Sequence, residues 1–215
     1  MNIKQFLFKA LLLLAITPLF FCCESNTKKS TDYFNRGYIE DNTYYNSFFN
    51  LKLPLPTNWH IMNDGELELI AESSALITNE KIEKHESEGF VDNTLISIFK
   101  YGLLDAPSFN YNFSLITNKV RGIKNGKEAA EELLEVFSRK NESMRILSKE
   151  FKAYNFGGKT FFNFETAQQL FDLSINQSFY ITVYRSYAII IILTYQTNEQ
   201  KKELAKFIKN ISFEE

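Results

Sequence analysis

The sequence predicts an α+β fold, in which an antiparallel β-sheet carries helices on both faces. Two strand hairpins are expected late in the chain, around Gly157-Gly158 and around Arg185-Ser186. The second arm of the later hairpin, residues 187–195, is almost wholly apolar, which is typical of a central strand covered on both sides. Helical patterns accompany these strands, and helices must therefore pack on both faces of the sheet.

The other strands follow from the spacing of apolar residues. Alternation over residues 49–53 predicts a half-buried strand, which Pro54 and Pro56 end. Residues 65–80 fit either a helix or a strand, and we favour a helix. Further strands are expected at residues 59–62, 94–102 and 112–120.

Two helices carry capping signals. The first covers residues 126–140, with Asn125 as its N-cap and Glu128 as the capping-box partner. The second begins after Thr197, which can cap it together with Gln200. Its apolar stripe consists of Leu204, Phe207, Ile208 and Ile211.

The N-terminus has the organisation of an export signal. Lys4 and Lys9 precede an apolar run over residues 10–21, which is too short to span a bilayer. The only two cysteines of the chain, Cys22 and Cys23, follow this run directly. Adjacent cysteines rarely bridge each other, and a zinc site would need further ligands at suitable spacing.

The position of the cysteines resembles a bacterial lipoprotein signal. The resemblance implies that the signal is cleaved and that the first cysteine of the mature chain carries a diacylglycerol. Leu19 at the −3 position favours Cys22, whereas the small residue at −1 favours Cys23, towards which we lean. A secretory signal that merely ends in cysteines, or an uncleaved anchor, is the alternative.

Three segments are therefore expected: a signal peptide at residues 1–22, a flexible polar tether at residues 23–43, and one domain at residues 44–215. Cleavage removes two of the 24 basic residues and none of the 26 acidic ones, which leaves a net charge of −4. The basic residues form no dense cluster along the chain, so we expect no nucleic-acid partner.

The opening and closing stretches of the domain resemble the PsbP-like fold. That superfamily contains an extrinsic photosystem II subunit, a yeast Ran-binding protein and many bacterial lipoproteins. The resemblance is carried by a Pro-x-x-Trp corner at Pro56 and Trp59, and by a last strand and helix that end in Ser212 and Phe213. It implies an α/β/α sandwich over residues 44–213 and supplies no catalytic residues.

No motif in the sequence predicts an enzyme. His60 and His85 are isolated from each other and from any recognisable nucleophile, and phosphate-cradling or metal-ligating patterns are missing from the sequence. We therefore expect no cofactor and no metal. A hydrolase with an unrecognised site remains as an alternative.

Aromatic residues gather in two stretches, residues 43–49 and 109–113. They fill the core or form an exposed interaction patch. The candidate patch consists of Tyr44, Tyr45, Phe109, Tyr111 and Phe113.

Together these observations predict a membrane-anchored lipoprotein of a bacterial envelope, on the periplasmic or outer-membrane side. Its domain is expected to be a non-enzymatic module that binds or supports another envelope protein. A small-ligand-binding lipoprotein is the alternative that keeps the same localisation.

Overall fold

The computed structural model describes residues 34–70, 93–106, 109–140, 144–148, 150–170 and 173–214. The predicted signal peptide, both cysteines and His85 lie outside these residues. Of the helix that we expected at residues 65–80, only the start is described, as a helix over residues 64–70.

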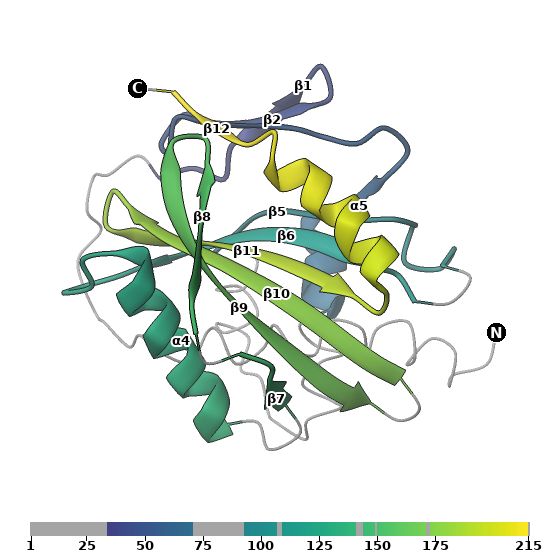
Figure 1. The fold of residues 1–215 in the computed structure, drawn as a ribbon. Coiled ribbons are helices and arrows are strands. Elements are labelled where there is room, and N and C mark those ends of the chain that lie inside the picture. The colour runs from purple at the N-terminus through teal and green to yellow at the C-terminus, as the bar shows by residue number, and fades with distance from the viewer. Residues whose placement is uncertain are drawn as a thin grey trace.

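Two antiparallel sheets form the fold (Figure 1). The smaller sheet has the order β1-β2-β3-β12. It consists of β1 (Tyr38–Glu40), β2 (Thr43–Asn46), β3 (Leu51–Pro54) and β12 (Ser212–Phe213).

The larger sheet has eight strands in the order β4-β5-β6-β11-β10-β9-β7, and β8 also pairs with β9. Its strands are β4 (His60–Ile61), β5 (Thr94–Phe99), β6 (Asn112–Lys119), β7 (Met144–Ile146), β8 (Lys152–Phe156), β9 (Lys159–Leu170), β10 (Leu173–Tyr184) and β11 (Tyr187–Tyr195). The helices that accompany it include α4 (Gly126–Lys140) and α5 (Asn198–Ile208).

The central strand is β11, as the sequence predicted. It lies between β6 and β10, and all nine of its residues are buried. Ile189 and Ile191 face a core that contains Leu204 of α5 and residues of the smaller sheet. Ile190 and Ile192 face a second core that contains Ala130 and other residues of α4. Figure 1 shows α4 and α5 on opposite sides of this sheet, so the predicted α+β class is confirmed.

Both predicted hairpins are present, and their turns use left-handed backbone conformations. Gly157 and Gly158 have φ angles of 55° and 79°, which glycine adopts without steric cost. Arg185 and Ser186 adopt φ angles of 51° and 63° despite their side chains. The uninterrupted pairing of β10 with β11, from Asn176–Tyr195 to Tyr184–Tyr187, holds this turn in place.

The helix caps also agree with the prediction. Thr197 and Gln200 form a reciprocal capping box at the start of α5. At α4, Asn125 accepts hydrogen bonds from the backbone of Lys127 and Glu128, at 3.0 and 3.1 Å. The Glu128 carboxylate reaches one residue further back than expected and accepts from the backbone N–H of Lys124 at 2.8 Å.

The folded domain begins earlier than predicted, within the segment that we expected to be a tether. Residues 38–46 form a hairpin, and its turn at Asp41 and Asn42 has φ angles of 44° and 56°. Phe34 already stacks on Tyr187, with ring centroids 5.2 Å apart. This segment looked like a tether because β1 is exposed along its whole length and shows no apolar alternation.

The stretch after α5 also joins a sheet. Ser212 and Phe213 form β12 and pair with Lys52 and Leu51 of β3. The smaller sheet therefore joins residues from both ends of the described chain.

Candidate functional site

The aromatic residues of the predicted interaction patch do not form an exposed surface. Tyr44, Phe109, Tyr111 and Phe113 are buried, and Tyr45 is half-buried against Tyr38 and Lys52. The prediction of a patch is wrong for these residues. Phe109, Tyr111 and Phe113 occupy every second position and all pack in the core on the α5 side of the sheet, so one covered face buries all three.

Tyr111 belongs to a polar cluster at the edge of the α5-side core. Its hydroxyl donates to the Glu203 carboxylate at 2.7 Å, and Lys100 Nζ contacts the other carboxylate oxygen at 2.8 Å. The same lysine lies 4.9 Å from the centre of the Trp59 ring, which packs edge-on against Tyr111 and Phe207. Trp59 is thus half-buried and packs against the core on the α5 side of the sheet.

The pKa values of Tyr111 and Glu203 shift in opposite directions in this cluster. Burial, followed by the adjacent Glu203 carboxylate, raises the pKa of Tyr111. Burial would also raise the pKa of Glu203, but hydrogen bonds from Lys100 and Tyr111 outweigh it, and this pKa is lowered. The cluster therefore holds an ionised Glu203 beside a neutral Tyr111 and binds α5 to β5 and β6.

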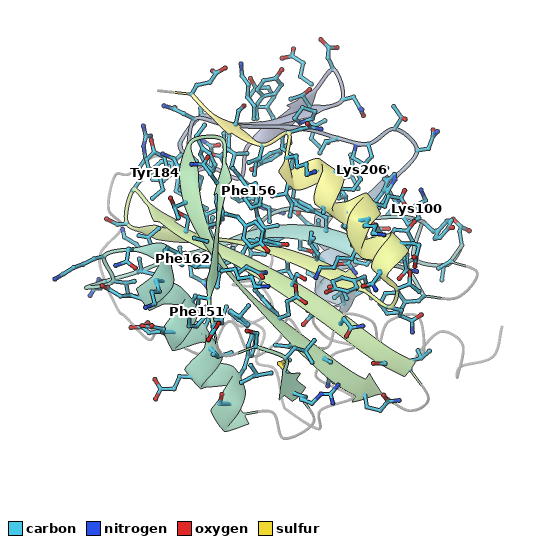
Figure 2. All side chains as sticks on the ribbon, in the orientation of Figure 1. Lys100, Phe151, Phe156, Phe162, Tyr184 and Lys206 are labelled. Carbon is cyan, nitrogen blue, oxygen red and sulfur yellow. The ribbon has the colours of Figure 1, made fainter. Side chains whose placement is uncertain are left out.

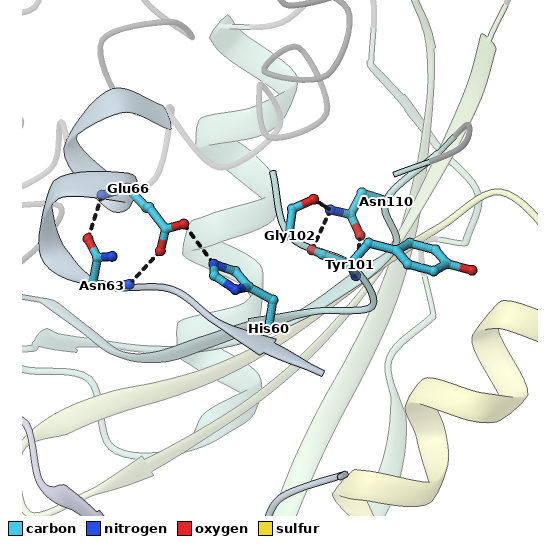
Figure 3. A network of polar contacts seen from close by, with 6 residues as sticks. All are labelled: His60, Asn63, Glu66, Tyr101, Gly102 and Asn110. Atoms are coloured by element: carbon cyan, nitrogen blue, oxygen red, sulfur yellow. Dashed lines mark hydrogen bonds and ion pairs between the residues drawn. The ribbon is translucent and has the colours of Figure 1, made fainter. Parts of the chain in front are cut away.

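His60 forms a second polar cluster, at the edge strand β4 (Figure 3). Its Nε2 atom lies 2.7 Å from Glu66, and the other carboxylate oxygen of Glu66 accepts from the backbone N–H of Asn63 at 2.9 Å. Asn63 in turn accepts from the backbone N–H of Glu66 at 3.0 Å, which completes a capping box at the helix over residues 64–70. The contacts of His60 therefore connect β4 to the start of this helix.

The neighbouring loop is closed by Asn110 (Figure 3). Its side chain accepts from the backbone N–H of Tyr101 at 3.0 Å and donates to the carbonyl of Tyr101 at 2.8 Å. Asn110 is buried, and these contacts hold the turn between β5 and β6.

Within the described parts of the chain, no group of three His, Cys, Asp or Glu side chains is arranged to hold a metal ion. None of the helices described there is both long and apolar enough to cross a membrane.

The strand β8 is the most exposed long edge in the larger sheet. Four of its five residues are exposed, and among the described strands it pairs only with β9. Because the turn at Gly157-Gly158 contains two residues, Phe156 and Lys159 form the closing hydrogen-bonded pair. The pattern alternates, so the N–H and C=O groups of Ala153 and Asn155 point away from β9.

Aromatic side chains lie beside this edge. Tyr154, whose residue is 38% exposed, stacks on Phe156 with ring centroids 5.9 Å apart and meets Tyr180 edge-on at 5.4 Å. Phe156 packs against the α5-side core, whereas Phe162 packs against the α4-side core (Figure 2). The edge of β8 thus combines outward-pointing backbone groups with an aromatic face on which Tyr154 is exposed and Phe156 is half-buried.

The sequence predicted the hairpin of β8 and β9 but not that β8 has an exposed edge. The sequence contains the Gly-Gly turn and both arms, whereas the strand order that leaves β8 with one neighbour depends on distant parts of the chain. The alternation of Lys152, Tyr154 and Phe156 with small or polar residues was the available signal.

The comparisons with known proteins give no family for this chain. No family model matches the sequence, and no curated protein matches it. Similar solved structures include a protein of Bacteroides thetaiotaomicron, at 15% identity and a TM-score of 0.43. That match covers 77% of this chain, which spans only 45% of the other protein.

Two further structures are similar over most of their length. The cyanobacterial PsbP protein of Synechocystis, CyanoP, is 9% identical with a TM-score of 0.49, and the match covers 88% of this chain and 100% of that one. LpqN, involved in cell envelope biogenesis of Mycobacterium tuberculosis, is 12% identical with a TM-score of 0.42, over 75% of this chain and 82% of that one. At these identities and TM-scores, membership of the PsbP-like superfamily stays a prediction.

Proposed function

We propose that this protein is an exported lipoprotein whose domain binds another protein of the bacterial envelope and catalyses no reaction. The N-terminal charge, the short apolar run and the cysteines at its end support the anchor. The single observation that supports the binding function is the exposed edge of β8, with its outward-pointing backbone groups and its aromatic face.

An extended segment of the partner adds to this edge as a further strand. The N–H and C=O groups of Ala153 and Asn155 supply its main-chain hydrogen bonds. Tyr154 and Phe156 lie on one face of β8 and contact alternate side chains of the segment. Apolar or aromatic residues at every second position of the partner therefore suit this surface.

The anchor is tested by fractionation of cells that express the full chain. We expect the double variant Cys22→Ala/Cys23→Ala to leave the membrane fraction, and globomycin to cause accumulation of the unprocessed form. The single variants identify the modified cysteine, and we expect Cys23→Ala to have the larger effect. Unchanged membrane retention of the double variant would show that no lipid anchor exists.

The edge is tested with a photo-crosslinking residue in place of Asn155, in the intact envelope. We expect a discrete adduct that is lost when Ala153→Pro is added, because proline removes an outward N–H group and spares the pairing with β9. Ala153→Thr, which keeps the N–H group, is the matched control. An adduct that forms equally in the proline variant would place the binding surface elsewhere.

A second candidate function, small-ligand binding, is favoured by one observation in the sheet interior. Asn112 and Gln177 are buried, and one side-chain oxygen of each has no hydrogen-bond partner within the described structure. Both residues lie directly opposite Thr194 of β11. Native mass spectrometry of the purified protein tests this candidate, which predicts a bound molecule that Asn112→Leu removes.

A further inference from the structure

Positive charge gathers at one end of the larger sheet, although the mature chain is predicted to be acidic. Lys159 follows the β8–β9 turn, Arg185 occupies the β10–β11 turn, and Lys119 ends β6 opposite Tyr187. We call this surface, together with Lys124, the basic end. Figure 1 shows both turns and the segment that leads into α4 on the same side of the molecule.

The segment before α4 is fixed against this end. The backbone N–H of Val120 donates to the carbonyl of Ser186 at 2.9 Å. The start of α4 lies so close to β10 that a Cβ on Gly126 would come within 2.5 Å of the Ile181 carbonyl. The segment that contains Lys124 therefore lies at the same end of the sheet as the β10–β11 turn.

These four cations form no ion pair within the described part of the chain, in contrast to Lys52, Lys100 and Lys201, which each pair with a carboxylate. The acid in this segment, Glu128, accepts hydrogen bonds from the Lys124 backbone and the Asn125 side chain. The Arg185 guanidinium donates a hydrogen bond to the carbonyl of Phe48, which leaves its charge in place. No carboxylate of the described residues therefore neutralises the basic end.

Aromatic rings position three of the four cations. Lys159 Nζ lies 3.7 Å from the centre of the Tyr184 ring, and the Arg185 guanidinium lies 5.4 Å from the same centre. Lys119 Nζ lies 5.9 Å from the centre of the Tyr187 ring. Lys159 and Arg185 thus gather at one ring, and contact with the rings reduces the side-chain freedom lost on binding.

The chain enters the domain at this same end. Phe34, the first described residue, stacks on Tyr187, the ring beneath Lys119. Only 11 positions separate Phe34 from Cys23, which corresponds to at most about 40 Å of extended chain. If Cys23 carries the anchor, the chain from the membrane joins the domain at the basic end, and this surface can reach the membrane.

We infer that the basic end rests on the phosphate groups of anionic phospholipids in the membrane that holds the anchor. The orientation of the basic end towards the membrane rests on the proposed lipid anchor. The affinity of the basic end for anionic lipid does not require the anchor. Positive side chains at an anionic surface each strengthen binding about fivefold, and the effect weakens with salt. The edge of β8 runs away from the turn that contacts the membrane and stays accessible to a partner.

The test uses the chain from residue 24 onwards, which contains every described residue and no cysteine. We expect it to bind vesicles made of equal parts phosphatidylglycerol and phosphatidylcholine, and not vesicles of phosphatidylcholine alone. The double variant Lys159→Gln/Arg185→Gln should bind about 25-fold more weakly. The matched control Arg145→Gln/Lys202→Gln removes the same charge from exposed positions elsewhere and should bind like the unaltered chain.

Three results would overturn the inference. The first is equal binding to the two kinds of vesicle, and the second is equal weakening of binding by the two double variants. The third is that inorganic phosphate displaces the protein from anionic vesicles more than chloride does at equal ionic strength. The last result would identify a site for soluble anions. The variant Lys159→Arg/Arg185→Lys keeps both charges and should bind anionic vesicles like the unaltered chain. If the Gln double variant bound weakly only because it folded poorly, retention of the charges would not matter. Because this chain carries no lipid, the outcome is independent of the fractionation experiment on the cysteines.

Discussion

The strands β11 and β8 belong to the same sheet and each adjoins a tight turn, yet they have opposite surroundings. β11 lies between β6 and β10 with every residue buried. Among the described strands, β8 pairs with β9 alone, and it exposes most of its residues. Burial of apolar side chains is the main source of stability, so β11 stabilises the domain. An exposed edge contributes little stability but offers backbone groups to another chain, so β8 is suited to recognition.

The largest expected effect separates the two strands by stability. Ile191→Ala removes a fully buried side chain from β11 and should lower the free energy of unfolding by about 2–5 kcal/mol. Tyr154→Ala on β8 should lower it by less than about 1 kcal/mol, because this side chain already contacts solvent. Urea denaturation measures both values, and a larger loss for Tyr154→Ala would reverse the assignment of roles.

Alkaline pH should destabilise the buried part of the fold. The pKa values of Tyr44, Tyr111 and Tyr180 are all raised, with burial as the first cause. The unfolded chain therefore loses protons near pH 10 while the folded chain retains them, so stability is complete below pH 10 and falls as pH rises further. Each tyrosine contributes at most about 1.4 kcal/mol per pH unit.

Urea denaturation at neutral pH and above pH 10 measures this loss. Tyr44→Phe should reduce the slope of stability against pH, because it removes one hydroxyl whose pKa is raised by burial. A stability that does not change with pH in this range would mean that the three hydroxyls ionise as readily in the folded protein as in the unfolded chain.

A smaller effect is expected at the polar cluster between α5 and the sheet. The pKa of Glu203 is lowered, so the stabilisation is present above the ordinary carboxyl pKa and is lost as pH falls through the folded-state value. Glu203→Gln should cost no more than about 1 kcal/mol at neutral pH, because solvent screens a partly exposed pair. The difference between variant and unaltered protein should shrink in acid, and a difference that grows there would refute this account of the cluster.

The smallest expected effect concerns the aromatic contacts of the basic end. Lys159→Gln removes the contact with Tyr184 and should change the free energy of unfolding by about 0.5–1 kcal/mol. Thermal denaturation can detect this change, with the exposed Lys202→Gln as control. A loss above about 2 kcal/mol would indicate that Lys159 is a structural residue, and its role at the membrane surface would need to be reassessed.

The fold was predictable where local chemistry determines it. The apolar run of β11, the Gly157-Gly158 turn and the Thr197 capping box are all visible in the sequence, and each gave the correct element. Strand β1 was not predictable in this way, because its three exposed residues carry no apolar pattern and it is held by pairing with β2.

The candidate site depends on contacts between distant residues, so the sequence indicated little of it. The density of aromatic residues suggested an exposed patch that includes Phe109 and Tyr111, but the residues that cover them come from other parts of the chain. The segment from Lys119 to Lys127 contains four cations and no acid, which is a local signal for the basic end. Lys159 and Arg185 join that surface only because two hairpin turns meet in the folded domain.

Amide hydrogen exchange at β8 tests the central claim most directly. In the unbound protein, the amides of Ala153 and Asn155 should exchange quickly and that of Tyr154 slowly, because only the last points towards β9. The crosslinking experiment identifies the partner, and the complex with this partner is then prepared without a crosslink. In that complex, the amides of Ala153 and Asn155 should become protected. If the complex forms and these two amides still exchange as in the unbound protein, the partner does not bind at the edge of β8.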